Sequence, residues 1–188
     1  MKENFYALEG LDGVGKSTVR DLLNQRGYVI LKTPPSSFPI ERSVYDNFEV
    51  MPRFLFFLMG VMQAGNEAEK ISTDRAVICD RYLLTTVAAH EAMGLSYSFL
   101  SSILPLLKET PVPKNTFLLI ASEEERIRRL TLRGANEIDI ANLKINSQIF
   151  QGYKKWSLIL GHKLSEVDTT CLPPKQVAEY IEDNIYSK

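Results

Sequence analysis

Hydrophobic positions cluster along this chain in five short runs, which alternate with longer segments in which apolar residues recur every three or four positions. We predict a strand at each run, namely at Asn4–Leu8, Tyr28–Leu31, Val77–Cys79, Thr116–Ile120 and Leu164–Asp168. The runs are almost wholly apolar, which is typical of strands that are covered on both faces.

The segments between the runs have helical spacing. We predict helices at Lys16–Gln25, Phe54–Glu69 and Leu83–Ala92, a short helix ending near Leu106, a helix from Ser122 to Arg133, and helices at Asn142–Leu160 and after Pro173. Because strands and helices alternate, the sequence predicts a three-layer α/β fold, in which a five-stranded parallel sheet is flanked by helices. Ligands bind such sheets at the carboxyl ends of the strands, so the residues that follow each strand are the candidates for chemistry.

Composition narrows the class of protein. With 188 residues, of which 45% are hydrophobic, the chain can bury a core as a single domain, residues 1–188, without disulfides. Its formal net charge of -1 lacks the excess of basic residues that is typical of proteins that bind nucleic acids or membrane surfaces, so we expect neither as a partner. Cys79 and Cys171 have no metal-type spacing and the first residues carry no signal-peptide pattern, so we expect a cytoplasmic protein.

The segment from Gly10 to Ser17 matches the phosphate-binding pattern G-x-x-x-x-G-K-S/T, and it lies between a predicted strand and a predicted helix. Backbone amides of such a loop hold phosphate oxygens, and glycine permits their close approach. We expect Lys16 to reach the β and γ phosphates of ATP, and the Ser17 hydroxyl to ligate Mg²⁺. The predicted cofactor-binding residues are Gly10, Asp12, Gly13, Val14, Gly15, Lys16, Ser17 and Thr18. A glycine-rich turn with an ordinary surface lysine is the alternative, and the strand–loop–helix context argues against it.

A phosphate loop alone does not separate kinases from GTPases or motor proteins. GTPases need a base-reading N-K-x-D pattern after a later strand, whereas here Asn115 follows Lys114 and precedes the strand. Motor ATPases are usually longer. The sequence therefore favours a small-molecule kinase with a P-loop NTPase fold.

The third predicted strand ends in Asp80 and Arg81. A carboxylate at this position can hold Mg²⁺ that bridges phosphates, and an arginine can clamp a phosphate with two hydrogen bonds. We therefore predict Asp80 as a metal ligand and both residues as catalytic, with a surface ion pair as the alternative.

Four arginines lie on the helix that follows Ser122, namely Arg126, Arg128, Arg129 and Arg133. All except Arg128 share one face, and the helix ends in a polar segment that predicts a small lid at about 133–142. We predict that Arg129 and Arg133 close over the transferring phosphoryl group and stabilise its charge. For Arg126 and Arg128, a solvated face paired with Glu123 to Glu125 stays an open alternative.

The motifs EGLDGVGKST, CDRY, RRLTLRG, FQGY and VDTT occur in an order and spacing that resemble the thymidylate kinase family of nucleoside monophosphate kinases. The resemblance covers most of the chain. It implies ATP as the donor, Mg²⁺, transfer to the 5′-phosphate of dTMP, and a homodimer. Asp12 matches the family aspartate that approaches the sugar of the acceptor, and Asp80 and Arg81 match the family's Asp-Arg pair. Where the family has Gly after that aspartate, as here at Gly13, a lid supplies the basic residues, which Arg129 and Arg133 match.

This chain departs from the family on the acceptor side. The family carries T-R-E-P-G-G-T after the second strand, and here Lys32 keeps the charge of its phosphate-binding arginine without the fork. Phe56 or Phe57 matches a phenylalanine that stacks on thymine, with core packing as the other interpretation. The arginine that follows that phenylalanine in the family is absent, because Val61 and its neighbours occupy the position.

After the Asp-Arg pair the family often reads S-S-x-A-Y-Q, where this chain has Thr85 through His90. We expect Thr85, Ala89 and His90 to contact the acceptor. Ala89 replaces a tyrosine that helps exclude a ribose 2′-hydroxyl, so a larger or ribose-bearing acceptor is a hypothesis. His90 replaces a glutamine, and a surface histidine is its alternative.

The resemblance and the residues together predict an ATP- and Mg²⁺-dependent kinase for dTMP or a related nucleoside monophosphate. Two alternatives stay open, a kinase for a nucleoside or another small metabolite and a nucleotide-binding sensor without turnover. Nucleoside kinases carry a glutamate after the second strand, and Thr33 at that position disfavours the first alternative.

Overall fold

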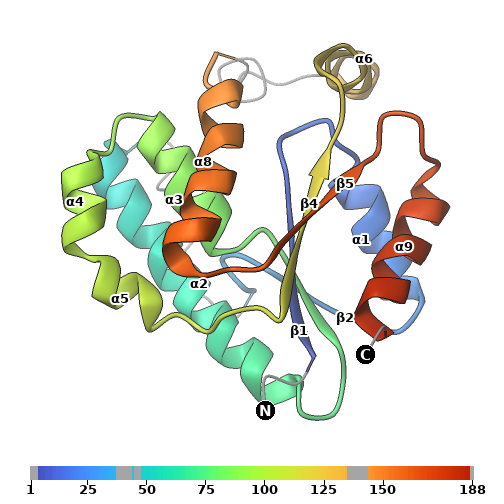
Figure 1. The fold of residues 1–188 in the computed structure, drawn as a ribbon, viewed down its shortest axis with the longest axis horizontal. Coiled ribbons are helices and arrows are strands. Elements are labelled where there is room, and N and C mark those ends of the chain that lie inside the picture. The colour runs from blue at the N-terminus through green and yellow to red at the C-terminus, as the bar shows by residue number, and fades with distance from the viewer. Residues whose placement is uncertain (1–3, 37–43, 45–47, 135–143, 187–188) are drawn as a thin grey trace.

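The computed structural model describes residues 4–36, 44, 48–134 and 144–186. Its centre is a five-stranded sheet in the order β2-β3-β1-β4-β5, with every neighbouring pair parallel (Figure 1). The strands are β1 (Phe5–Glu9), β2 (Val29–Lys32), β3 (Val77–Asp80), β4 (Asn115–Ile120) and β5 (Leu164–Asp168). The predicted three-layer α/β fold with five parallel strands is therefore confirmed, with strand ends that differ by at most one residue from the prediction.

Helices cover both faces of the sheet, as Figure 1 shows. Two of them, α1 (Lys16–Gln25) and α9 (Pro174–Tyr186), lie on one side. The other side carries α2 (Val50–Ile71), α3 (Leu83–Ala92), α4 (Tyr97–Ser102), α5 (Leu104–Lys108) and α8 (Asn146–Leu160). One further helix, α6 (Glu123–Arg133), follows β4 at the carboxyl edge of the sheet.

Alternation along β1 sends side chains into two separate cores. Phe5 and Ala7 join the core beneath α2, α3 and α8, whose largest member is Trp156. Tyr6 and Leu8 join the core beneath α1 and α9. The apolar strand run thus reflects cover on both faces, as the sequence predicted.

Two helices begin at residues other than those predicted, and the short helix predicted to end near Leu106 is two helices, α4 and α5. Helix α2 begins at Val50, four residues before the predicted start, because Pro52 lies in its first turn, where proline is tolerated. Helix α8 begins at Asn146, whereas the predicted start at Asn142 lies outside the described residues. The predicted lid at about 133–142 also lies outside them, apart from Arg133 and Gly134.

The burial of side chains along α2 shows which part of its apolar run belongs to the core. Phe54, Phe56 and Val61 are fully buried, whereas Leu55 and Met59 are 44% and 49% exposed and lie one turn apart on the outer side. Within the described residues, no helix has the length and hydropathy needed to span a membrane.

Candidate active site

The loop between β1 and α1 has a backbone that only glycine adopts easily. Gly10 and Gly13 have φ angles of 141° and 85°. A Cβ atom would lie 2.4 Å from the Leu119 carbonyl oxygen at Gly10, and 2.8 Å from the Arg126 carbonyl oxygen at Gly13. Both conformation and space therefore require glycine here, and the loop packs directly against the ends of β4 and α6.

A cavity of about 560 Å³ opens at the carboxyl ends of β1 and β3. It is walled by the loop after β1, the end of β3, and faces of α2, α3, α6 and α8. Most of the residues predicted from the sequence line it: Asp12, Gly13, Gly15, Lys16, Ser17, Thr18, Phe57, Asp80, Arg81, Thr85, Ala89, His90, Arg129 and Arg133. Its volume suits small-molecule ligands.

Four predicted site residues do not line this cavity. Val14 and Phe56 are buried in the core, so the interpretation of Phe56 as a stacking residue is wrong and Phe57 takes the cavity position. Gly10 supports the loop through its carbonyl oxygen. Lys32 is exposed at the end of β2, outside the wall, because the next residue, Thr33, is the one that turns inward.

Lys16 lies almost completely buried at the base of the loop, with 7% of its surface exposed. Its Nζ donates to the carbonyl oxygens of Gly10 and Leu11, at 2.7 and 2.8 Å. Burial, and secondly the nearby Arg81, lower the pKa of Lys16 to about 7, although Asp12 and two further carboxylates oppose this. An ammonium held by two carbonyl oxygens at the base of the loop is suited to bind phosphate oxygens.

Two oxygen donors for a cation, Ser17 and Asp80, line the cavity. Asp80 Oδ2 accepts a hydrogen bond from Arg20 Nη1 at 2.8 Å, a partner that the sequence did not indicate. The described residues contain no group of three His, Cys, Asp or Glu side chains able to hold a metal ion. The donor set nevertheless fits Mg²⁺, which binds few protein ligands and takes its others from phosphates and water.

Arg81 has a left-handed backbone conformation, with φ of 65°, which is rare for a residue with a side chain. Its backbone N–H donates to the Leu8 carbonyl at 3.0 Å, and the Arg81 carbonyl accepts from Thr33 Oγ1 at 3.0 Å. Its guanidinium donates to the Gly10 carbonyl oxygen and pairs with the Asp12 carboxylate. Strain of this kind concentrates at functional sites, and here it directs the guanidinium into the cavity.

Glu9 is a buried carboxylate that sequence reasoning missed, because it ends a strand read only for its apolar residues. Its side chain accepts hydrogen bonds from the backbone N–H groups of Tyr82 and Thr85, at 2.9 and 3.2 Å, and from the Thr85 hydroxyl. It thereby caps α3, whose own first residues supply no side-chain cap. The Tyr153 hydroxyl lies 2.9 Å from Thr85 Oγ1 and extends this network to the cavity wall. Burial raises the pKa of Glu9, although the hydrogen bonds from Thr85 and the charge of Arg81 oppose the rise.

The far end of the cavity is formed by Arg53, Phe57 and His90. The Arg53 guanidinium carbon lies 5.9 Å from the Phe57 ring centroid, and the rings of Phe57 and His90 are 5.6 Å apart. The arginine that follows the phenylalanine in the family is absent, as the sequence showed, but Arg53 supplies a guanidinium to the cavity that was not predicted. The guanidinium comes from one turn before the phenylalanine instead of one turn after it, since α2 starts earlier than predicted.

His90 is 4% exposed, so the interpretation as a surface histidine is wrong. Its Nδ1 lies 2.7 Å from the Thr86 carbonyl oxygen, which can only accept, so Nδ1 carries the proton. Burial, aided by the charge of Arg53 and opposed by the hydrogen bond to the Thr86 carbonyl, lowers the pKa of His90 to about 4, so the ring is neutral at pH 7. Its Nε2 is then a hydrogen-bond acceptor, and it is buried without a hydrogen-bond partner in the described part of the chain.

The arginines of α6 have different roles, and those of Arg126 and Arg129 were not predicted. Arg128 forms an exposed ion pair with Glu125, so the solvated interpretation holds for it. Arg126 is buried and its Nε donates to the Asp12 carbonyl at 2.8 Å, so the solvated interpretation is wrong there. Arg133 lines the cavity at the end of α6, as predicted.

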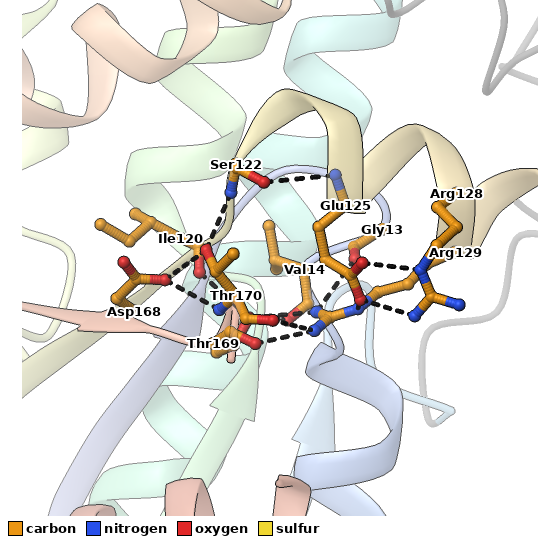
Figure 2. Close-up of polar contacts among 10 residues, drawn as sticks. All are labelled: Gly13, Val14, Ile120, Ser122, Glu125, Arg128, Arg129, Asp168, Thr169 and Thr170. Atoms are coloured by element: carbon orange, nitrogen blue, oxygen red, sulfur yellow. Dashed lines mark hydrogen bonds and ion pairs between the residues drawn. The ribbon is translucent and has the colours of Figure 1, made fainter. Parts of the chain in front are cut away.

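Arg129 contacts protein acceptors with every part of its guanidinium, as Figure 2 shows. Its Nε donates to Glu125 at 2.7 Å, its Nη1 to Thr169 Oγ1 at 3.1 Å, and its Nη2 to the Thr169 carbonyl at 2.7 Å. The predicted closure of Arg129 over a phosphoryl group does not fit this arrangement. Ser122 accepts from the Glu125 N–H as in a capping box, but the Glu125 carboxylate turns to the arginines.

Comparison with known proteins identifies one enzyme family. The profile described as thymidylate kinase matches residues 8–181. A probable thymidylate kinase of Pyrococcus horikoshii is 31% identical over 152 residues, which are 71% of this chain and 73% of that relative. A thymidylate kinase of Caldicellulosiruptor saccharolyticus is 24% identical over 173 residues, 84% of each chain.

Solved structures show the same fold. A thymidylate kinase from Candida albicans has a TM-score of 0.77 at 20% identity, covering 97% of this chain and 91% of its own. A deoxyadenosine kinase from M. mycoides with bound dATP has a TM-score of 0.75 at 19% identity, covering 97% of this chain and 100% of its own.

Proposed function

This chain belongs to the thymidylate kinase family and is a nucleoside monophosphate kinase, and on that premise we propose that it transfers the γ-phosphoryl group of ATP to the 5′-phosphate of dTMP or a related nucleoside monophosphate, with Mg²⁺. One observation carries the proposal. A single cavity of about 560 Å³ joins a phosphate loop at one end to an aromatic and hydrogen-bonding wall at the other. Both substrates of a direct phosphoryl transfer fit such an arrangement.

The donor end would hold the phosphates of ATP. The loop amides and Lys16 are placed for the phosphate oxygens, and Ser17 and Asp80 for Mg²⁺. The ion neutralises charge on the phosphates when it is bound. Arg133, at the end of α6, is the cavity-lining cation assigned to the transferring group.

The acceptor end would hold a nucleoside monophosphate. Arg81 and Asp12 lie where the acceptor phosphate and sugar would meet the loop. The phosphate of such an acceptor is already ionised at neutral pH, so the reaction needs positioning and no general base. This agrees with Thr33, the residue directly after β2, which is not a carboxylate.

Base recognition would rest on Phe57 and His90. The Phe57 ring offers a stacking surface. The Nε2 atom of His90 can only accept, so it could accept a hydrogen bond from the base, for example from N3–H of thymine or uracil. Ala89, which also lines the cavity, leaves room beside the sugar, so a ribonucleotide acceptor stays part of the proposal.

A homodimer in the cytoplasm completes the proposal. Leu55 and Met59 form an exposed apolar pair on the outer side of α2, which suits burial against a second copy. The thiols of Cys79 and Cys171 are unpaired, which suits a reducing compartment. Size-exclusion chromatography with light scattering tests the dimer, and a monomer at all concentrations would contradict it.

The function is tested with purified protein, Mg²⁺-ATP and a panel of nucleoside monophosphates and nucleosides, by following ADP and phosphorylated product. We expect a nucleoside diphosphate from dTMP or from a close relative such as dUMP or UMP. Phosphorylation of nucleosides, without phosphorylation of nucleoside monophosphates, would show that the protein is a nucleoside kinase. ATP binding without any product would favour a sensor.

A further inference from the structure

Three consecutive carbonyl groups of the phosphate loop each accept a hydrogen bond from a side chain of α6 or of the segment after β5. Arg126 Nε donates to the Asp12 carbonyl at 2.8 Å, Arg129 Nη1 to the Gly13 carbonyl at 3.5 Å, and Thr169 Oγ1 to the Val14 carbonyl at 2.8 Å. We propose that these three side chains, which we call the carbonyl clamp, are positioning residues that preset the loop amides for phosphate. The inference rests on the proposed function in taking phosphate as the ligand of this loop.

The geometry of the peptide unit carries the argument. In a planar trans peptide the carbonyl of one residue and the N–H of the next point in opposite directions. Holding the carbonyls of Asp12, Gly13 and Val14 outward therefore turns the N–H groups of Gly13, Val14 and Gly15 the other way. These amides belong to the segment that would cradle phosphate oxygens, since Gly13 and Gly15 line the cavity.

The clamp is anchored to the rigid part of the fold. Thr169 is 3% exposed, and its backbone N–H donates to the Ile120 carbonyl at 2.8 Å, at the carboxyl ends of β4 and β5. Its hydroxyl has one proton, shared between the carbonyls of Val14 at 2.8 Å and Ile120 at 3.0 Å, and it accepts from Arg129. Figure 2 shows that Glu125 on α6 holds the opposite side of the Arg129 guanidinium.

This arrangement explains why Arg129 is not aimed at the cavity centre. A guanidinium has five N–H groups, and the structure gives Arg129 five contacts, to Glu125, Gly13, Thr170 and twice to Thr169. Its N–H groups are thus engaged by protein acceptors before any ligand arrives. A loop ordered in advance loses less conformational entropy on binding, so the clamp raises phosphate affinity by ordering the loop.

Thr169 offers the sharpest test, because it does not line the cavity and has two matched variants. Thr169→Val keeps the shape and removes the hydroxyl, whereas Thr169→Ser keeps the hydroxyl. Binding of Mg²⁺-ATP and of inorganic tripolyphosphate is measured by calorimetry, with hydrogen exchange at the amides of residues 13–15. We expect Thr169→Val to lower the affinity for both ligands about tenfold and to speed exchange, because about one buried hydrogen bond is lost. The affinities of Thr169→Ser should stay within about twofold of those of the unaltered chain.

Further readouts separate positioning from a general loss of structure. The KM for the acceptor should not change in Thr169→Val, because the acceptor end lies elsewhere. If Thr169→Val does not fold, Arg129→Lys, which keeps the charge and loses the fork, replaces it and should speed hydrogen exchange at the amides of residues 13–15 in the ligand-free protein. Equal affinities and exchange rates in Thr169→Val and Thr169→Ser would overturn the clamp. An unaltered chain that binds neither ATP nor tripolyphosphate would instead overturn the proposed function.

Discussion

Lys16 should take up a proton when a phosphate ligand binds. In the free site its pKa is about 7, chiefly because of burial and secondly because of Arg81, against the opposing charges of Asp12, Asp80 and Glu9. A bound polyphosphate adds negative charge beside Nζ and raises this pKa toward the ordinary lysine value, since an opposite charge favours the ammonium. The polyphosphate therefore binds preferentially to the protein in which Lys16 is protonated, so the affinity for this ligand should fall as pH rises through 7.

The magnitude follows from linkage. With a free-site pKa of about 7, Lys16 is half protonated at pH 7, so binding takes up about 0.5 proton there and about 0.9 proton at pH 8. The dissociation constant for the nucleotide should rise about tenfold from pH 6 to pH 8, which corresponds to about 1.4 kcal/mol.

Calorimetry in buffers of different ionisation enthalpy measures this uptake directly. Lys16→Arg is the matched control, because a guanidinium stays protonated over this range, and the uptake that remains in it belongs to the nucleotide. The reasoning would be refuted if, at pH 8, the heat of binding changed with the ionisation enthalpy of the buffer to the same extent in Lys16→Arg and in the unaltered protein. Lys16 would then already be charged before the ligand binds.

Three further predictions concern the loop, the acceptor end and the contact between α3 and α8. Gly13→Ala, at a φ of 85° and with its Cβ 2.8 Å from the Arg126 carbonyl oxygen, should destabilise the fold by at least about 1–2 kcal/mol, and an unchanged urea midpoint would contradict this. His90→Leu should raise the KM for the monophosphate about tenfold with little change in ATP affinity, and His90→Gln, which keeps an acceptor, should lose less; equal KM values would remove His90 from base recognition. Gly152→Ala would place its new Cβ atom 2.7 Å from the Cβ atom of Ala88 and should lower the free energy of unfolding by about 1–3 kcal/mol. An unchanged thermal unfolding midpoint would show that the two helices can separate at no cost.

The fold and the donor end were predictable because local rules determine them. Short apolar runs alternate with helical segments, and parallel strands bury both faces, so five strands could be placed within one residue of their ends. The phosphate loop is continuous in sequence, from Gly10 to Ser17, and Asp80 ends a strand that neighbours β1. Contacts of this kind follow from motif and topology alone.

The acceptor end was less predictable because its residues come together only through packing. Arg53 was missed since Pro52 hid the start of α2, and Glu9 was missed since a carboxylate inside an apolar strand run has no local signature. The role of Arg129 depends on Thr169, which is 40 residues away along the chain. Helical spacing placed the arginine on the correct face of α6, but its hydrogen-bond acceptors belong to another element.

The most direct test of the central proposal is the identity of the product. The protein is incubated with Mg²⁺-ATP and an equimolar mixture of nucleoside monophosphates, and the nucleotides are separated and identified by mass. We predict that ADP and one nucleoside diphosphate appear in equal amounts, from dTMP or from another monophosphate whose base presents an N–H group to His90. ADP without any nucleoside diphosphate, or no ADP at all, would contradict direct transfer between the two ends of this cavity.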